Sequence, residues 1–183
     1  ALLKRCNRLW NMYGPTETTI WSAIKRVTQF DADNYPIIPI GRAIRNTVLR
    51  VLNDEGRPVT GVHSGELYIG GAGLAEGYFR QAQMTSDRFI VDPYGRSKND
   101  LLYKTGDLVR WDDRGELLFL ERKDNQIKLR GYRIEAGEIE NAISELGHID
   151  EAMVILFEGN DGVKQLVAAV AAKEDSFTGE EPI

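Results

Sequence analysis

The sequence predicts an α+β fold, in which a larger β-rich part is followed by a small lobe of order strand, helix, strand, strand. Strand-like segments separated by turn signals dominate before Asp124, and one amphipathic helix follows it. The charge balance changes at the same point, since residues 1–124 hold 18 basic and 16 acidic side chains, whereas residues 125–183 hold 5 and 12. We therefore predict a domain boundary near Asp124, with parts 1–123 and 124–183.

Alternating, β-branched and aromatic residues predict the elements of the larger part. Strands are expected at 18–27, 47–52 and 66–69, and a helix at 80–88. The turn 53–56 predicts a hairpin with 57–60, and the turn 112–115 predicts a hairpin of 108–111 with 116–120. In the smaller part we expect strands at 126–130, 151–157 and 164–171, and a helix at 135–146.

Composition excludes several classes of protein. With 42% hydrophobic and 28% charged residues among 183, the chain is typical of a globular protein rather than a disordered one. A net charge of −5 argues against a nucleic-acid partner, and no apolar run reaches the ~20 residues that span a membrane, so we expect a cytoplasmic protein with neither partner. One cysteine and two histidines exclude a disulfide framework and a cysteine-rich zinc site.

The segment 11–19, NMYGPTETT, is the first candidate for chemistry. The turn at Gly14 and Pro15 makes the neighbouring side chains project from one loop. A Tyr13 ring can stack on a planar base, the Thr16 hydroxyl can donate to a phosphate, and Glu17 can hold Mg²⁺. A simple Gly-Pro turn with a capping threonine explains the same pattern.

Three further motifs have both a chemical and a purely structural interpretation. The glycine-rich segment 65–78, GELYIGGAGLAEGY, matches no phosphate-loop or dinucleotide pattern, and tight turns explain it better. Asp107, just beyond a glycine turn, could accept hydrogen bonds from two vicinal hydroxyls such as those of ribose, or could form an Asx turn. The basic segment 122–133 could contact phosphates or form a solvated strand face; its cations are Arg122, Lys128, Arg130 and Arg133.

Taken in order, four motifs resemble the adenylation domain of nonribosomal peptide synthetases, in the superfamily that also contains acyl-CoA ligases and luciferases. They are NMYGPTETT, GELYIGGAGLAEGY, YKTGDL and RKDNQIKLRGYRIEAGEIE, and the resemblance extends from Asn11 to Val170. It implies the distal, β-rich part of the large adenylation lobe (1–123) and the start of the small C-terminal lobe (124–183). The implied activity forms aminoacyl-AMP from ATP and an amino acid, with Mg²⁺. The aminoacyl group then passes to the phosphopantetheine thiol of a peptidyl carrier protein.

The resemblance also implies a role for individual residues. Thr16 and Glu17 are the expected catalytic residues, with Glu17 as the Mg²⁺ ligand. The expected ATP and AMP contacts are Tyr13 on adenine, Gly14, Thr16 at the α-phosphate, Asp107 on ribose and Arg122 beside ribose or phosphate. The amino-acid pocket would be lined by Met12, Ile20 and Trp21. Asp124 would be the hinge, and the pantetheine tunnel would be bordered by Lys128, Arg130 and Gly131.

The resemblance has departures and leaves alternatives open. Glu121 stands where the family usually has glycine, which bears on the Arg122 contact, and Ala136 replaces a usual leucine. The upstream phosphate loop, the acidic partner of the substrate amino group and the C-terminal catalytic lysine are not in the sequence, so we expect no aminoacyl-AMP formation by these 183 residues alone. The chain would work with the remainder of the adenylation domain and other synthetase domains. The alternatives are an acyl-CoA or aryl-acid ligase, and a non-catalytic module that docks a carrier protein.

Overall fold

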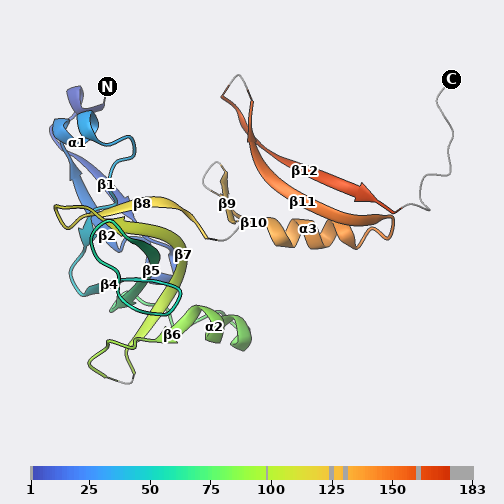
Figure 1. Ribbon diagram of the computed structural model, residues 1–183, viewed down its shortest axis with the longest axis horizontal. Helices are drawn as coiled ribbons and strands as arrows, with labels where there is room; N and C mark the ends of the chain where they lie inside the picture. The colour runs from blue at the N-terminus through green and yellow to red at the C-terminus, as the bar shows by residue number, and fades with distance from the viewer. Residues whose placement is uncertain (1, 98, 124–125, 130–131, 160–161, 174–183) are drawn as a thin grey trace. The chain divides into compact units, whose positions relative to one another are not determined.

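The computed structural model describes residues 2–97, 99–123, 126–129, 132–159 and 162–173. The chain divides into two compact units, residues 1–123 and 124–183 (Figure 1). The α+β, strand-rich class predicted from the sequence is confirmed. Each unit has its own hydrophobic core.

Two antiparallel sheets make up most of the first unit. The smaller sheet has the order β1-β2-β3, from β1 (Leu9–Tyr13), β2 (Ala23–Val27) and β3 (Arg42–Ala43). The larger has the order β4-β5-β7-β6 with β8 added on β7, from β4 (Thr47–Leu52), β5 (Ser64–Gly71), β6 (Phe89–Val91), β7 (Leu101–Trp111) and β8 (Leu117–Arg122). Helices α1 (Gln29–Asn34) and α2 (Ala82–Arg88) lie between strands along the chain. An isolated bridge between Gly41 and Leu117 joins the region after β2 to β8.

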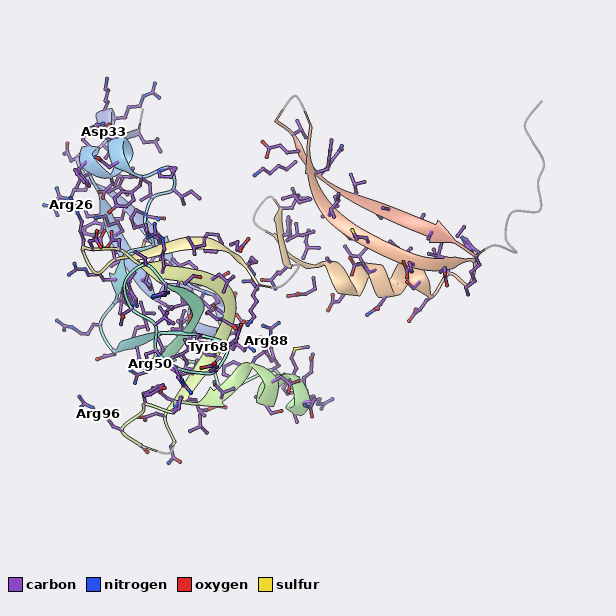
Figure 2. The ribbon with its side chains drawn as sticks, in the orientation of Figure 1. Arg26, Asp33, Arg50, Tyr68, Arg88 and Arg96 are labelled. Atoms are coloured by element: carbon purple, nitrogen blue, oxygen red, sulfur yellow. The ribbon has the colours of Figure 1, made fainter. Side chains whose placement is uncertain are left out.

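Strand β5 is central because both of its faces are covered. Leu67 and Ile69 pack into the main core cluster, whereas Tyr68, on the opposite face, packs with Leu52 and Leu102. Tyr68 lies directly opposite Arg50 of β4, and the two are close together in Figure 2. Burial, followed by the charge of the neighbouring Glu66, raises the pKa of Tyr68 to about 12. A strand that is buried on both faces needs apolar residues at nearly every position, and the segment ELYIG has this composition.

A buried ionic cluster ties the smaller sheet to the β7–β8 hairpin. Lys25 Nζ lies 3.1 Å from Asp31 Oδ1 and 2.8 Å from Glu116 Oε2. The side chain of Asp31 is 1% exposed and those of Lys25 and Glu116 are each 13% exposed. Because these charges are removed from water, their mutual pairing is needed to offset the cost of desolvation.

The second unit contains β9 (Gln126–Leu129), β10 (Tyr132–Glu135), α3 (Ala136–Ser144), β11 (Ile149–Glu158) and β12 (Lys164–Ala172). Strands β9 and β10 form one antiparallel pair, and β11 and β12 form another. The packed core of the unit includes Ile127, Ala136 and Val154, with Ile139 and Ile143 of α3 against it. Ala136 is buried at the start of the helix, so its small side chain fits this core position.

Several elements differ from the sequence expectation. The strand predicted from Thr18 begins only at Ala23, because a 3₁₀ turn covers Thr16–Thr18 and positive φ angles follow it. The predicted 57–60 hairpin partner forms only a short pairing with β4: Asn53 N donates to Arg57 O and Val59 N donates to Val51 O, both at 2.9 Å, around a bridge between Leu52 and Pro58. Proline has no N–H with which to extend a ladder. The sequence pattern missed β1, β3, β6, β10 and α1, which are short.

Candidate functional site

A bulge in β7 determines where Asp107 lies. Glu66 of β5 faces Leu108 and Tyr68 faces Lys104, so residues 105–107 bulge opposite Leu67 alone. Gly106 has a φ of +76°, which favours glycine, and its N–H donates to Glu66 Oε1 at 3.1 Å. Bulges of this kind re-aim a side chain. The glycine turn expected before Asp107 is therefore a bulge within a long strand, and the Asp107 side chain is buried.

Two side chains distant in sequence donate to the two oxygens of Asp107. The hydroxyl of Tyr13, the last residue of β1, donates to Oδ2. Arg122, the last residue of β8, pairs in register with Asp107 and donates from Nη1 to Oδ1 at 2.8 Å. Burial, followed by the negative charge of Asp107, raises the pKa of Tyr13 well above its usual value, so the hydroxyl remains a donor at neutral pH.

The structure therefore brings together Tyr13, Asp107 and Arg122, three of the residues named from the sequence. Arg122 reaches Asp107 although Glu121 precedes it, because the strand register alone places the two opposite each other. An aromatic ring, a carboxylate and a guanidinium at one point can stack on a base, accept from hydroxyls and neutralise phosphate charge.

The loop after Tyr13 is held closed by backbone contacts. Ser22 N donates to Tyr13 O at 2.7 Å, and Ile20 N donates to Pro15 O at 3.2 Å. A Cβ on Gly14 would lie 2.5 Å from Ile20 O and 2.7 Å from Ser22 N, so only glycine fits without a shift. The turn exposes Thr16 and buries Glu17, which is 8% exposed. The two residues predicted to be catalytic thus face different surroundings.

Glu17 contacts the glycine-rich segment. Tyr78 donates its hydroxyl hydrogen to Glu17 Oε1 at 2.7 Å, and Ala75 N donates to Glu17 O at 2.8 Å. Nearby, the Thr19 hydroxyl donates to Gly73 O at 2.7 Å. Sequence reasoning assigned this segment to tight turns and missed Tyr78, although the tyrosine ends the quoted motif directly after Gly77.

The three residues predicted to line an amino-acid pocket are exposed. Met12 is 39% exposed on the outer face of β1, and Ile20 and Trp21 are 63% and 55% exposed after the 3₁₀ turn. Ile20 has a φ of +68°, unusual for a β-branched residue and typical of functional loops. A cavity of about 830 Å³ beside β5 and β7 and one of about 560 Å³ in the second unit are both lined by other residues.

The hinge and tunnel predictions concern the second unit. Asp124, Arg130 and Gly131 lie outside the described residues. Lys128 lies in β9, where its backbone pairs with Arg133 of β10. The hinge and tunnel roles remain predictions.

The candidate Mg²⁺ ligand, Glu17, does not belong to a larger cluster of metal ligands among the described residues. In the described part of the chain, no three His, Cys, Asp or Glu side chains gather as a metal cluster. Mg²⁺ is commonly bound by one or two carboxylates together with the phosphates of a substrate and retained waters. A single carboxylate such as that of Glu17 therefore fits an ion that is bound together with a nucleotide.

Known proteins are similar to this chain in sequence and in fold. Residues 1–79 match the family described as AMP-binding enzyme. The chain is 44% identical over 170 residues to a dimodular nonribosomal peptide synthase of Bacillus subtilis, covering 93% of this chain. It is 46% identical over 154 residues to a phosphinothricin tripeptide synthetase of Streptomyces viridochromogenes, covering 84% of this chain. The first 79 residues of this chain are thus similar to AMP-binding enzymes, and most of the chain is similar to nonribosomal peptide synthetases.

Solved structures are similar to this chain in fold. PA1221, an NRPS protein containing adenylation and PCP domains, superimposes with a TM-score of 0.81 and 37% identity, over 96% of this chain and 35% of that one. AB3403, a four-domain nonribosomal peptide synthetase in its holo form bound to AMP and glycine, superimposes with a TM-score of 0.61 and 41% identity. The match covers 94% of this chain and 13% of that one.

The chain spans 7% of the length of the Bacillus synthase and 14% of the length of the Streptomyces synthetase. Among the described residues, no helix combines the length and apolar character that crossing a membrane requires.

Proposed function

We propose that this chain is the part of an amino-acid-activating adenylation domain that holds the adenosine and the metal-bound phosphates. The parent enzyme joins the carboxylate of an amino acid to the α-phosphate of ATP, which releases pyrophosphate. It then passes the aminoacyl group to the phosphopantetheine thiol of a carrier protein. The observation that carries this proposal is the meeting of Tyr13, Asp107 and Arg122 in a chain with peptide-synthetase relatives.

Asp107 is the proposed ribose ligand. A carboxylate has about four acceptor sites on two oxygens, so it can receive two vicinal hydroxyls while keeping part of its present contacts. Arg122 fixes the carboxylate from one side at 2.8 Å, which limits its rotation before the nucleotide arrives. The ring of Tyr13 offers the stacking face for adenine, and its hydroxyl ties that ring to the ribose ligand.

Thr16 and Glu17 act at the phosphates in this proposal. The Thr16 side chain is exposed and its hydroxyl can donate to an α-phosphate oxygen. Glu17 supplies the carboxylate for Mg²⁺, and the ion, when bound, offsets phosphate charge during the transfer. Met12, Ile20 and Trp21 are exposed apolar side chains, and we assign them to the binding of the amino-acid side chain.

Peptide-synthetase relatives favour an amino acid over a fatty or aryl acid as substrate. The second half-reaction requires a carrier protein, and PA1221 contains adenylation and PCP domains in one protein. We assign the swivelling of the small lobe to Asp124, and the border of the pantetheine path to Lys128, Arg130 and Gly131. These residues belong to the basic motif by which the chain resembles the family.

The proposal is tested by amino-acid-dependent ATP–pyrophosphate exchange. The complete adenylation domain that contains this chain should exchange with at least one of the common amino acids, whereas the 183 residues alone should not. Asp107→Ala should lower kcat/KM for ATP at least about tenfold, since a hydrogen bond to a charged group is worth about 1.5–3 kcal/mol. Glu55→Gln, at an exposed surface ion pair, is the control. Exchange with aryl or fatty acids only, or unimpaired exchange and carrier loading by Asp107→Ala, would contradict the proposal.

A further inference from the structure

The second half of the glycine-rich segment, residues 71–78, makes contacts that tight turns alone do not explain. It lies against the loop that carries Glu17, through Gly73 and Ala75, and ends at Tyr78. A Cβ on Gly73 would lie 3.0 Å from Thr18 O, so a larger residue would push the two loops apart. The segment thus brings a tyrosine to a carboxylate that is 61 residues away in sequence.

We propose that Tyr78 is a positioning residue for Glu17, and that its hydroxyl orients the carboxylate toward the Mg²⁺ of the bound nucleotide. This inference rests on the proposed function, because it assumes that Glu17 is the metal ligand. Groups that hydrogen-bond to a metal ligand orient it, and losing one typically costs about 10–100-fold in metal affinity or activity.

Tyr78 is itself held by two neighbours, Thr85 and Phe89. Its backbone N–H donates to Thr85 Oγ1 of α2 at 2.9 Å. Its ring packs edge-on against Phe89, with 5.7 Å between the ring centroids and 73° between the planes. Phe89 packs in turn on the fully buried Tyr103, at 5.3 Å. A side chain fixed in this way places its hydroxyl with little freedom, which is what a positioning role requires.

Gly77 explains how the tyrosine fits so close to α2. Its φ is +144°, and a Cβ there would lie 2.4 Å from Thr85 Cγ2. Alanine at this position would therefore separate residue 78 from Thr85.

The chain offers a matched control. The hydroxyl of Tyr35 donates to Asp112 Oδ2 at 2.7 Å, the same chemistry and distance as Tyr78 with Glu17. Asp112 lies in the turn between β7 and β8. Its described hydrogen bonds involve none of the residues proposed to bind the nucleotide. Tyr35→Phe therefore removes an equivalent bond away from the site.

The experiment compares Tyr78→Phe, Tyr35→Phe and Glu17→Gln in the complete adenylation domain. Binding of Mn²⁺, a paramagnetic substitute for Mg²⁺, is followed by electron paramagnetic resonance in the presence of α,β-methylene-ATP. The Mg²⁺ dependence of pyrophosphate exchange is measured alongside. We expect Tyr78→Phe to raise the half-saturating metal concentration about tenfold or more, and Tyr35→Phe to leave it unchanged. Adding Tyr78→Phe to Glu17→Gln should produce no further loss, because the tyrosine acts through the glutamate.

The inference is overturned if a folded Tyr78→Phe protein has a half-saturating metal concentration within about twofold of the wild type. It is also overturned if Tyr35→Phe raises that concentration as much as Tyr78→Phe does. If thermal unfolding shows that Tyr78→Phe does not fold, Thr85→Val takes its place. It removes the hydroxyl that fixes residue 78 and should shift the metal response in the same direction; no shift overturns the inference. A wild-type domain that exchanges with no amino acid refutes the proposed function instead, which separates the two failures.

Discussion

The pair formed by Asp107 and Arg122 allows a quantitative prediction about unfolding. Both side chains are largely buried, at 4% and 15% exposed, and their charged atoms are 2.8 Å apart. Arg122→Met keeps the apolar stem and removes the charge, which leaves a buried carboxylate with less compensation. Breaking a buried pair from one side costs about 3–5 kcal/mol. With a slope of about 2 kcal/mol per M, the urea midpoint should fall by roughly 1.5–2.5 M.

Tryptophan fluorescence of the 183-residue chain is a suitable assay. All three tryptophans (Trp10, Trp21 and Trp111) lie in the first unit, so their emission reports on the unit that contains the pair. The second variant is Asp107→Asn, and the third combines both substitutions.

The double variant has no uncompensated charge, so it should lose less stability than the sum of the two single variants, by at least about 1.5 kcal/mol. If the two single-variant losses sum to within about 0.5 kcal/mol of the double-variant loss, the two charges do not stabilise each other, and the reasoning is refuted.

Three further predictions concern stability. Gly14→Ala should cost about 1–3 kcal/mol in urea unfolding, because its Cβ meets backbone atoms at 2.5 and 2.7 Å; a neutral result would mean that the loop relaxes freely. Gly137→Ala, in α3 with open space around the new Cβ, should instead stabilise by about 0.5 kcal/mol, as measured by circular dichroism; a loss would contradict this account of the helix. Although burial raises the pKa of Asp31, hydrogen bonds from Thr28 and Lys25 lower it overall, below the usual 3.8. The stability that Asp31 contributes is therefore present above about pH 3.8 and lost as the pH falls through the folded-state pKa. In Lys25→Met the loss of unfolding free energy on acidification should be smaller, and the free energy of unfolding at pH 7 should be lower by about 3–5 kcal/mol. An unchanged dependence of the unfolding free energy on acidic pH would refute the role of Lys25.

Local patterns predicted much of the fold. The apolar and β-branched segment 47–52 indicated β4 with its observed ends, and the turn at 112–115 indicated the β7–β8 hairpin, because both signals act over a few neighbouring residues. The short strands β1 and β6 escaped detection, since three to five residues carry too little periodicity to identify a strand.

The amino-acid sequence was enough to reveal the resemblance to peptide-synthetase adenylation domains, through four motifs in order, and the residue types available for nucleotide chemistry. Only the tertiary structure decided which of them meet. Tyr13 and Asp107 are 94 residues apart and join because β1, the β7 bulge and the β8 register bring three chain segments to one carboxylate. Tyr78 had no local signal of a role, because its partner Glu17 lies across a loop contact that only the packed glycine-rich segment creates. Contacts over such separations depend on strand register and close packing, and neither is encoded in the neighbourhood of any single residue.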